Sequence, residues 1–165
     1  MMESIRTVFT PSNVSFMMEG LKLALLISVG VVILSIIFGT VLGLLRNYEK
    51  KVFGKLAGAY IELFRNTPLL LWMLSCSFLI PGSTITLKGS FALFLYTSAV
   101  VAEIVRGGLN SIPKGQFEAG HSQGFSFMQT LRYIILPQAF KKIIPSLLSQ
   151  VITTIKDTSF LAGLG

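Results

Sequence analysis

An uncharged stretch over residues 23–45 constrains this chain more than any other feature of its sequence. As a helix, the stretch is long enough to cross the ~30 Å hydrocarbon core of a bilayer. Of all residues, 52% are hydrophobic and 13% are charged, whereas soluble domains are about one quarter charged. We therefore expect an all-α, polytopic membrane protein that forms a single domain over residues 1–165.

Three glycines in this stretch suit close contact with a neighbouring helix. They are Gly30, Gly39 and Gly43, and the last two have the G-x-x-x-G spacing. Small residues at this spacing let two helix backbones approach each other inside a membrane. The pattern predicts that another helix packs against this face.

The basic residues that follow the stretch give its orientation. Arg46, Lys50, Lys51 and Lys55 outnumber Glu49 there, and cytoplasmic loops carry an excess of Lys and Arg. We expect this loop in the cytoplasm and the N-terminus outside. The N-terminal residues lack the pattern of a removable signal peptide, so the first span should itself direct insertion. The formal net charge of +7 then reflects such loops rather than nucleic-acid binding.

Three further apolar segments make about four transmembrane segments in all. They cover residues 67–81, 90–108 and 143–155. The segment over 90–108 is short for a span, and the one over 143–155 is short and contains polar residues. Residues 106–142 are basic and form a second cytoplasmic loop. Its side of the membrane agrees with that of the first loop.

Charged pairs at i, i+3 lie just before the second apolar segment and within the third. Glu62 and Arg65 are three residues apart, as are Glu103 and Arg106, so each pair shares one helix face. Ionisable groups inside a membrane usually face a partner or a water-filled cavity. The alternative for the first pair is an interfacial ion pair that ends the span.

The polar stretch "EAGHSQGFSFMQTLRYIILP" lies between the last two segments. Ser111 and Pro113 indicate the start of a helix, and Gly124 can adopt the left-handed conformation that ends it. Ser126 and Gln129 have the spacing of a capping box, which predicts a second helix.

This second helix is expected to be amphipathic. Its apolar stripe at helical spacing contains Phe127, Met128, Leu131, Ile134 and Ile135. A proline at position 137 is expected to break or redirect the chain before the next span. The two helices either present a rigid knob to a cytoplasmic partner or lie on the membrane surface without one.

The same stretch resembles the EAA loop of ABC-importer permeases. Glu118, Ala119, Gly120 and Gly124 and the "IILP" ending follow that motif in order and spacing. The stretches "ELFRNTPLLL", "AEIVRGGLNSIPKGQFEAG" and "IKDTSF" narrow the resemblance to permeases for polar amino acids, such as histidine and glutamine. The family usually has glycine in place of Asn66, leucine in place of Phe160 and alanine in place of Gly120. The family-like core covers residues 17–160.

The resemblance implies a permease of the bacterial cytoplasmic (inner) membrane that imports a polar amino acid. Its implied partners are cytoplasmic ABC ATPases, a second permease subunit and an extracytoplasmic solute-binding protein. The EAA-like loop, about residues 107–136, would dock on the ATPase. The expected docking residues are Glu118, Ala119, Gly120, His121 and Gly124. Further residues would support the loop: Phe127, Leu131, Leu136 and Pro137.

A zwitterionic substrate needs countercharges or helix ends in a cavity of low dielectric constant. The candidates along its path are Glu62, Arg65, Glu103, Arg106, Lys156, Asp157, Thr158 and Ser159. Lys156 and Asp157 have an alternative role as a neutralising pair at the outer end of a span. His121 is expected to be an interface residue rather than a proton switch or a metal ligand.

No catalytic role, metal site or cofactor is expected in this chain. The sequence has no phosphate-loop motif for ATP and no zinc or nucleophile motif of an intramembrane enzyme. Its single cysteine, Cys76, excludes an internal disulfide and is expected to be an inert buried thiol. The rival hypothesis is a membrane scaffold or assembly subunit that docks a cytoplasmic partner without conducting substrate.

The chain departs from the family at its C-terminal end. Family members typically continue with one more span after the "KDTS" segment and finish inside the cell, whereas this sequence ends at Gly165. The sequence is therefore expected to be either a fragment or a shortened permease. Either way, the coupling loop is intact.

Overall fold

The computed structural model describes residues 9–49 and 51–163, and every element among them is helical. The helices are α2 (Pro11–Tyr48), α3 (Val52–Arg65), α4 (Leu69–Leu79), α5 (Ile85–Asn110), α6 (Lys114–Ser122), α7 (Phe127–Thr130), the π-helical turn η1 (Leu131–Ile135), α8 (Leu136–Asp157) and α9 (Ser159–Ala162). The chain is therefore all-α in its described part, as expected.

Helices α2 and α5 form the central pair of the bundle and share its most extensive interface. A Cβ added to Gly39 would lie 2.6 Å from the Ser98 carbonyl oxygen, and one added to Gly43 would lie 2.5 Å from the Ala102 carbonyl oxygen. Both distances are too short for any side chain, so the G-x-x-x-G pair is confirmed as a helix-packing site. Gly30 faces open space, so the expectation that it also packs closely was wrong for this chain.

Two described helices are long and apolar enough to cross a bilayer, namely α2 and α5. Helix α2 has 38 residues and starts at Pro11, capped by the Thr10 hydroxyl, which accepts from the Asn13 backbone N–H. Helix α2 is therefore longer than the uncharged stretch over residues 23–45 from which the first span was predicted. Helix α5 has 26 residues and is capped by Thr84, so the expectation of a short third segment was wrong.

The two remaining predicted segments also fall within helices. Helix α4 is apolar but has only 11 residues, which at 1.5 Å per residue is about 16 Å long. Helix α8 has 22 residues, which is long enough to span, but it carries polar residues along its length. In α4, Cys76 is buried and free, as expected.

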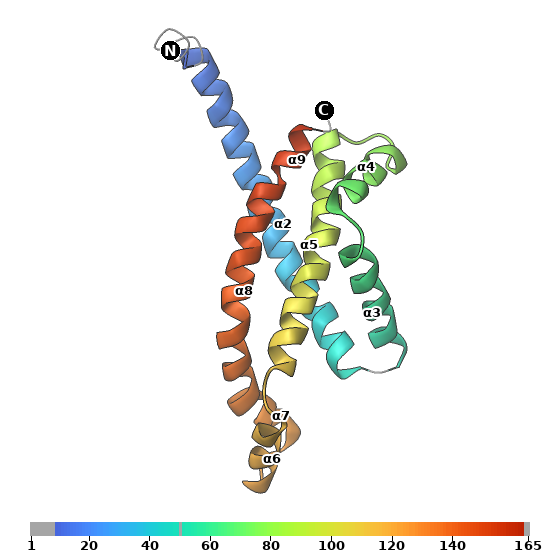
Figure 1. Ribbon diagram of the computed structural model, residues 1–165, viewed down its shortest axis with the longest axis vertical. Coiled ribbons are helices and arrows are strands. Elements are labelled where there is room, and N and C mark those ends of the chain that lie inside the picture. The colour runs from blue at the N-terminus through green and yellow to red at the C-terminus, as the bar shows by residue number, and fades with distance from the viewer. Residues whose placement is uncertain (1–8, 50, 164–165) are drawn as a thin grey trace.

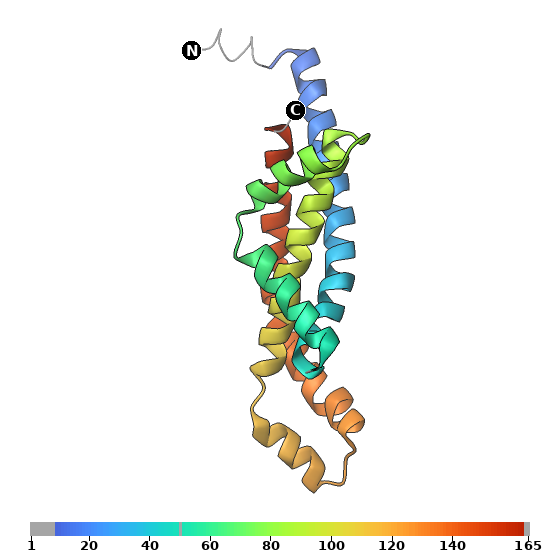
Figure 2. The same ribbon diagram turned by 90° about the vertical axis from the view of Figure 1, so that its right-hand side faces the viewer.

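Helices α2, α5 and α8 run along the long direction of the molecule, with α8 beside the central pair, whereas the short α4 lies obliquely to them (Figures 1 and 2). The ends of α2 and α9 that lie near the chain termini are at one end of the molecule, and α6 and α7 project beyond the bundle at the opposite end (Figures 1 and 2). The turn between α2 and α3 also lies toward the end where α6 and α7 project. The two basic loops therefore lie toward the same end; Lys50, in the first loop, is outside the described residues.

Candidate functional site

The projecting loop begins with helix α6, which starts at Lys114 after Pro113 in the N-cap position. Proline fits there because its fixed φ suits a helix start and no backbone N–H is required. The Lys142 ammonium donates to the Ser111 carbonyl oxygen at 2.8 Å. This contact ties the start of the loop to α8.

Helix α6 ends in a Schellman motif at Gly124. The Phe125 N–H donates to the Gly120 carbonyl oxygen at 3.0 Å, and the Gly124 N–H donates to the His121 carbonyl oxygen at 2.9 Å. The φ of Gly124 is 78°, in the left-handed region that favours glycine. The predicted role of Gly124 as the end of the first loop helix is confirmed.

The second loop helix, α7, begins with the predicted capping box. The Ser126 hydroxyl accepts from the Gln129 backbone N–H, and the Gln129 side chain accepts from the Ser126 backbone N–H at 2.8 Å. Both terminal donors are thereby satisfied. The direction of each loop helix is therefore set by a specific terminal motif.

Gly120 joins the two loop helices rather than facing outward. It is buried, and a Cβ added to it would lie 2.7 Å from both Cγ2 and Oγ1 of Thr130. Thr130 is itself fully buried. The small size of Gly120 therefore serves the packing of α6 against α7, and its expected role in docking stays a prediction.

The other expected docking residues lie on the outside of the loop. Glu118, Ala119, His121 and Gly124 are all exposed. The Ser122 hydroxyl donates to the Glu118 carbonyl oxygen at 2.9 Å, which leaves the Glu118 side chain outside that contact. The described loop thus presents a carboxylate beside a small residue and an imidazole.

The predicted apolar stripe divides into two parts. Leu131, Ile134 and Ile135 pack against the core between α5 and α8. Phe127 and Met128 are exposed to 49% and 66%, so only part of the stripe is packed against the bundle. The ring of Phe127 contacts the ring of Tyr48 edge to face, with 6.2 Å between centroids, so the loop also reaches the end of α2.

The chain stays helical through the "IILP" ending. Leu136 is half-buried against the core and Pro137 is exposed in the first turn of α8, directly after η1. A proline is tolerated in a first turn, and the wider π turn precedes it. Of the two expected roles of Pro137, to break or to redirect the chain, the break is not found, because the helix continues through it.

A network of ion pairs joins α2, α3 and α5. Glu103 accepts two hydrogen bonds from Arg106, one of them from Nε at 2.9 Å. Its carboxylate also lies 3.8 Å from the Arg46 guanidinium and 3.7 Å from the Arg65 guanidinium. The predicted pairing of Glu103 with Arg106 is confirmed, and Glu103 is the centre of the network.

Glu62 and Arg65 take their partners from other helices. Arg46 donates to Glu62 at 2.6 Å, and Arg65 lies near Glu103. Among the described residues, no ion pair joins Glu62 to Arg65, so the expectation that they pair on one helix face is corrected. The sequence places Arg46 in the basic loop and does not predict its contacts with Glu62 and Glu103. The position of Arg46 directly after the apolar stretch is the sequence feature that could have indicated these contacts.

The remaining substrate-path candidates lie near α9. Lys156 and Ser159 are exposed, Asp157 is half-buried, and Thr158 is buried with its hydroxyl donating to the Ile155 carbonyl oxygen at 2.7 Å. A hollow of about 540 Å³ between α2, α5 and the end of α8 is lined in part by Lys156, Thr158 and Ser159. This group lies at the end of the molecule with the chain termini (Figure 1), so the structure does not bring the two sets of candidates together.

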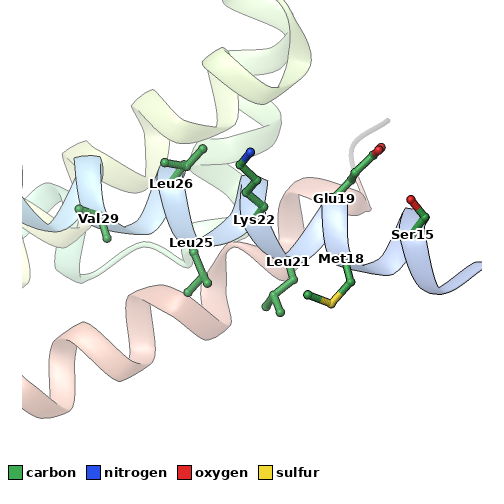
Figure 3. Close-up of a pocket in the computed structure, with 8 residues that line it drawn as sticks. All are labelled: Ser15, Met18, Glu19, Leu21, Lys22, Leu25, Leu26 and Val29. Atoms are coloured by element: carbon green, nitrogen blue, oxygen red, sulfur yellow. The ribbon is translucent and has the colours of Figure 1, made fainter.

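A second hollow of about 580 Å³ runs along the N-terminal part of α2 (Figure 3). All eight of its lining residues come from this single helix, and most of them are apolar. Glu19 and Lys22 are its charged residues. None of the predicted site residues borders this hollow.

The family profile described as "Binding-protein-dependent transport system inner membrane component" matches residues 35–165. The match covers most of the chain, including the projecting loop and the ion-pair network. The chain belongs to this family. The resemblance to ABC-importer permeases that its motifs indicated is thereby confirmed.

Two relatives from Bacillus subtilis (strain 168) are similar over most of this permease-family chain. The "Probable glutamine ABC transporter permease protein GlnP" is 37% identical over 155 residues, covering 92% of this chain and 71% of the relative. The "Probable glutamine ABC transporter permease protein GlnM" is 40% identical over 159 residues, covering 92% and 74%.

Two solved structures have the same fold. One, described as an amino acid ABC transporter with histidines, matches with a TM-score of 0.71 and 30% identity over 90% of this chain and 75% of its own. The other, an inward-facing MetNI methionine ABC transporter, matches with a TM-score of 0.79 over 95% and 78%. Its identity of 19% supports the likeness in fold alone.

Proposed function

We propose that this chain is the transmembrane subunit of an ATP-driven importer that passes a polar amino acid across the cytoplasmic membrane. The single observation that carries the proposal is the projecting loop. Its two helices are held by a Schellman motif, a capping box and the contact of Gly120 with Thr130, while Glu118, Ala119 and His121 remain exposed. A rigid loop with an exposed, partly charged face suits docking to another protein.

The partner of this loop is an ABC ATPase in our proposal. The family match and the 30% identical amino acid ABC transporter structure support an assembly that includes ATPases and a binding protein. ATP hydrolysis would then occur in the partner chain, and this chain would respond by shifting between conformations. A second permease subunit completes the membrane part.

The proposed topology has four membrane-crossing segments in this chain, with the N-terminus outside. Support comes from the common end occupied by the two basic loops, because such loops are retained in the cytoplasm. The hollow beside Lys156, Thr158 and Ser159 then lies toward the outside. We propose that it receives the amino acid from the solute-binding protein.

The test is association with the ATPase after reconstitution. We expect Glu118→Lys to weaken co-purification of the ATPase by about tenfold or more, since reversing an interface charge costs upwards of about 1.4 kcal/mol. Glu19→Lys is the matched control, because it makes the same charge change at an exposed residue of α2 far from the loop. Equal co-purification of both variants would reject the docking assignment.

A further inference from the structure

Helix α8 has three distinct faces along its length. One face is buried against the bundle and contains Ala139, Ile143 and Thr154. A second face is exposed and apolar, with the residues Phe140, Ile144, Leu148, Ile152 and Ile155. An exposed apolar face is what a helix presents to lipid.

The third face is exposed and polar. It contains Lys142, Ser146, Ser149, Thr153 and Lys156, all exposed, and we call it the polar stripe. Successive members are four, three, four and three residues apart, so they share one side of the helix. From the first lysine to the last, the stripe is about 21 Å long at 1.5 Å per residue, which is most of the thickness of a hydrocarbon core.

Lipid is an unfavourable neighbour for this stripe. Polar groups inside a membrane almost always face protein or water. The Ser149 hydroxyl donates to the Pro145 carbonyl oxygen at 3.2 Å, and the Thr153 hydroxyl donates to the Ser149 carbonyl oxygen at 3.0 Å. Their protons are therefore used within the helix, while their oxygen lone pairs remain available as outward-facing acceptors.

The helix itself adds a further polar group beside the stripe. Pro145 lies inside α8 and has no N–H, so the intrahelical hydrogen bond to the Lys141 carbonyl oxygen is missing. A freed carbonyl at membrane depth requires another donor, which water can supply.

We propose that the polar stripe of α8 lines a water-filled path for a solute that carries a carboxylate. The two lysines place positive charge at both ends of the stripe, and residues 138–156 contain no Asp or Glu. The hydroxyl oxygens between them are acceptors for an ammonium group. The inference rests on the proposed function for the identity of the solute as an amino acid, whereas the water-filled path is tested without it.

The chain has a single cysteine, so one substitution gives a cysteine-free background. In a Cys76→Ala background, single cysteines replace Ser149 or Thr153 on the polar stripe and Leu148 or Ile152 on the adjacent apolar face. The assembled transporter in membrane vesicles is treated with two membrane-impermeant methanethiosulfonates, one with a sulfonate and one with a trimethylammonium group. Ser→Cys is nearly isosteric, so the fold is retained in at least one stripe variant.

We expect both stripe cysteines to be labelled on the order of tenfold or more faster than both apolar-face cysteines, because the reactive thiolate forms in water and not in hydrocarbon. Each rate is divided by the rate of the same reagent with a small free thiol in solution, because the cationic reagent reacts faster with any thiolate. On this relative scale the anionic reagent should react faster than the cationic one, since the two lysines attract it. Equal labelling of the two faces, or protection of the stripe by another protein surface, would overturn the path. A higher relative rate for the cationic reagent would overturn the preference for a carboxylate.

Cysteine labelling tests the water-filled path independently of the proposed function. Labelling depends on water at the stripe and not on ATP hydrolysis. If the stripe is labelled but the reconstituted assembly transports no amino acid, the path is retained and the proposed function is rejected.

Discussion

The seam between α2 and α5 and the seam between α6 and α7 both depend on glycine, but in different ways. In the bundle, Gly39 and Gly43 face the backbone of α5 at consecutive turns. In the loop, Gly120 faces two side chains, those of Thr130 and Ile134. A backbone cannot move without moving its helix, whereas a side chain can rotate. The bundle seam should therefore tolerate no substitution, while changes in the loop seam should alter docking and leave the membrane part folded.

The largest effect is expected for Gly43→Leu. Its Cβ would lie 2.5 Å from the Ala102 carbonyl oxygen, and the helices must separate to admit it. We expect a cost greater than the about 1–3 kcal/mol of ordinary overpacking, seen as loss of monodisperse protein after solubilisation. Gly30→Leu is the matched control in the same helix, since a side chain there meets open space. Equal yields of the two variants would contradict the account of this seam.

A smaller and more local effect is expected for Gly120→Val. The clash with Thr130 should cost about 1–3 kcal/mol and turn α6 relative to α7, so that ATPase co-purification falls while the permease stays monodisperse. Gly115→Val is the control, because that position is open. Adding Thr130→Ala should partly restore co-purification, and a failure to do so would argue against the internal role of Gly120.

The ion-pair network should be sensitive at its centre. Glu103→Gln removes the carboxylate charge that three arginines share, and we expect about 1–2 kcal/mol of destabilisation after allowance for its partial exposure. The measurement is thermal unfolding in detergent. Glu62→Gln is the comparison, since the Glu62 side chain is 63% exposed, and it should cost less. The reverse order would contradict the central position of Glu103.

The smallest effect is expected for Ser126→Ala, which removes one half of the capping box. Loss of such a cap costs about 1 kcal/mol, and because α7 is short, local hydrogen exchange in α7 should report it better than global unfolding. Ser122→Ala is the control, because that hydroxyl only bonds within its own helix. Identical exchange in the two variants would show that the cap does not hold α7.

Features set by local chemistry were predictable from the sequence. Four expected features are found: the capping box at Ser126, the left-handed Gly124, the packing of Gly39 and Gly43 against a neighbouring helix, and the pairing of Glu103 with Arg106. Each depends on residues within a few positions of one another, or on a packing motif with a fixed spacing.

Features that depend on how distant segments meet were not predictable. Arg46 reaches Glu62 and Glu103 only because α3 and α5 fold back beside the end of α2. The inward position of Gly120 depends on the angle between α6 and α7, which no residue spacing discloses. Gly30 looks like the other glycines in sequence, yet no helix among the described residues covers it.

The most direct test of the central claim is the rate of ATP hydrolysis in proteoliposomes, with and without the loaded solute-binding protein. We expect the binding protein to stimulate hydrolysis several-fold in the wild-type assembly and in Glu19→Lys, and we expect Glu118→Lys to abolish the stimulation. Equal stimulation in Glu118→Lys would contradict coupling through this loop. Absence of stimulation in the wild-type assembly would contradict an importer and favour a scaffold that docks a partner without conducting substrate.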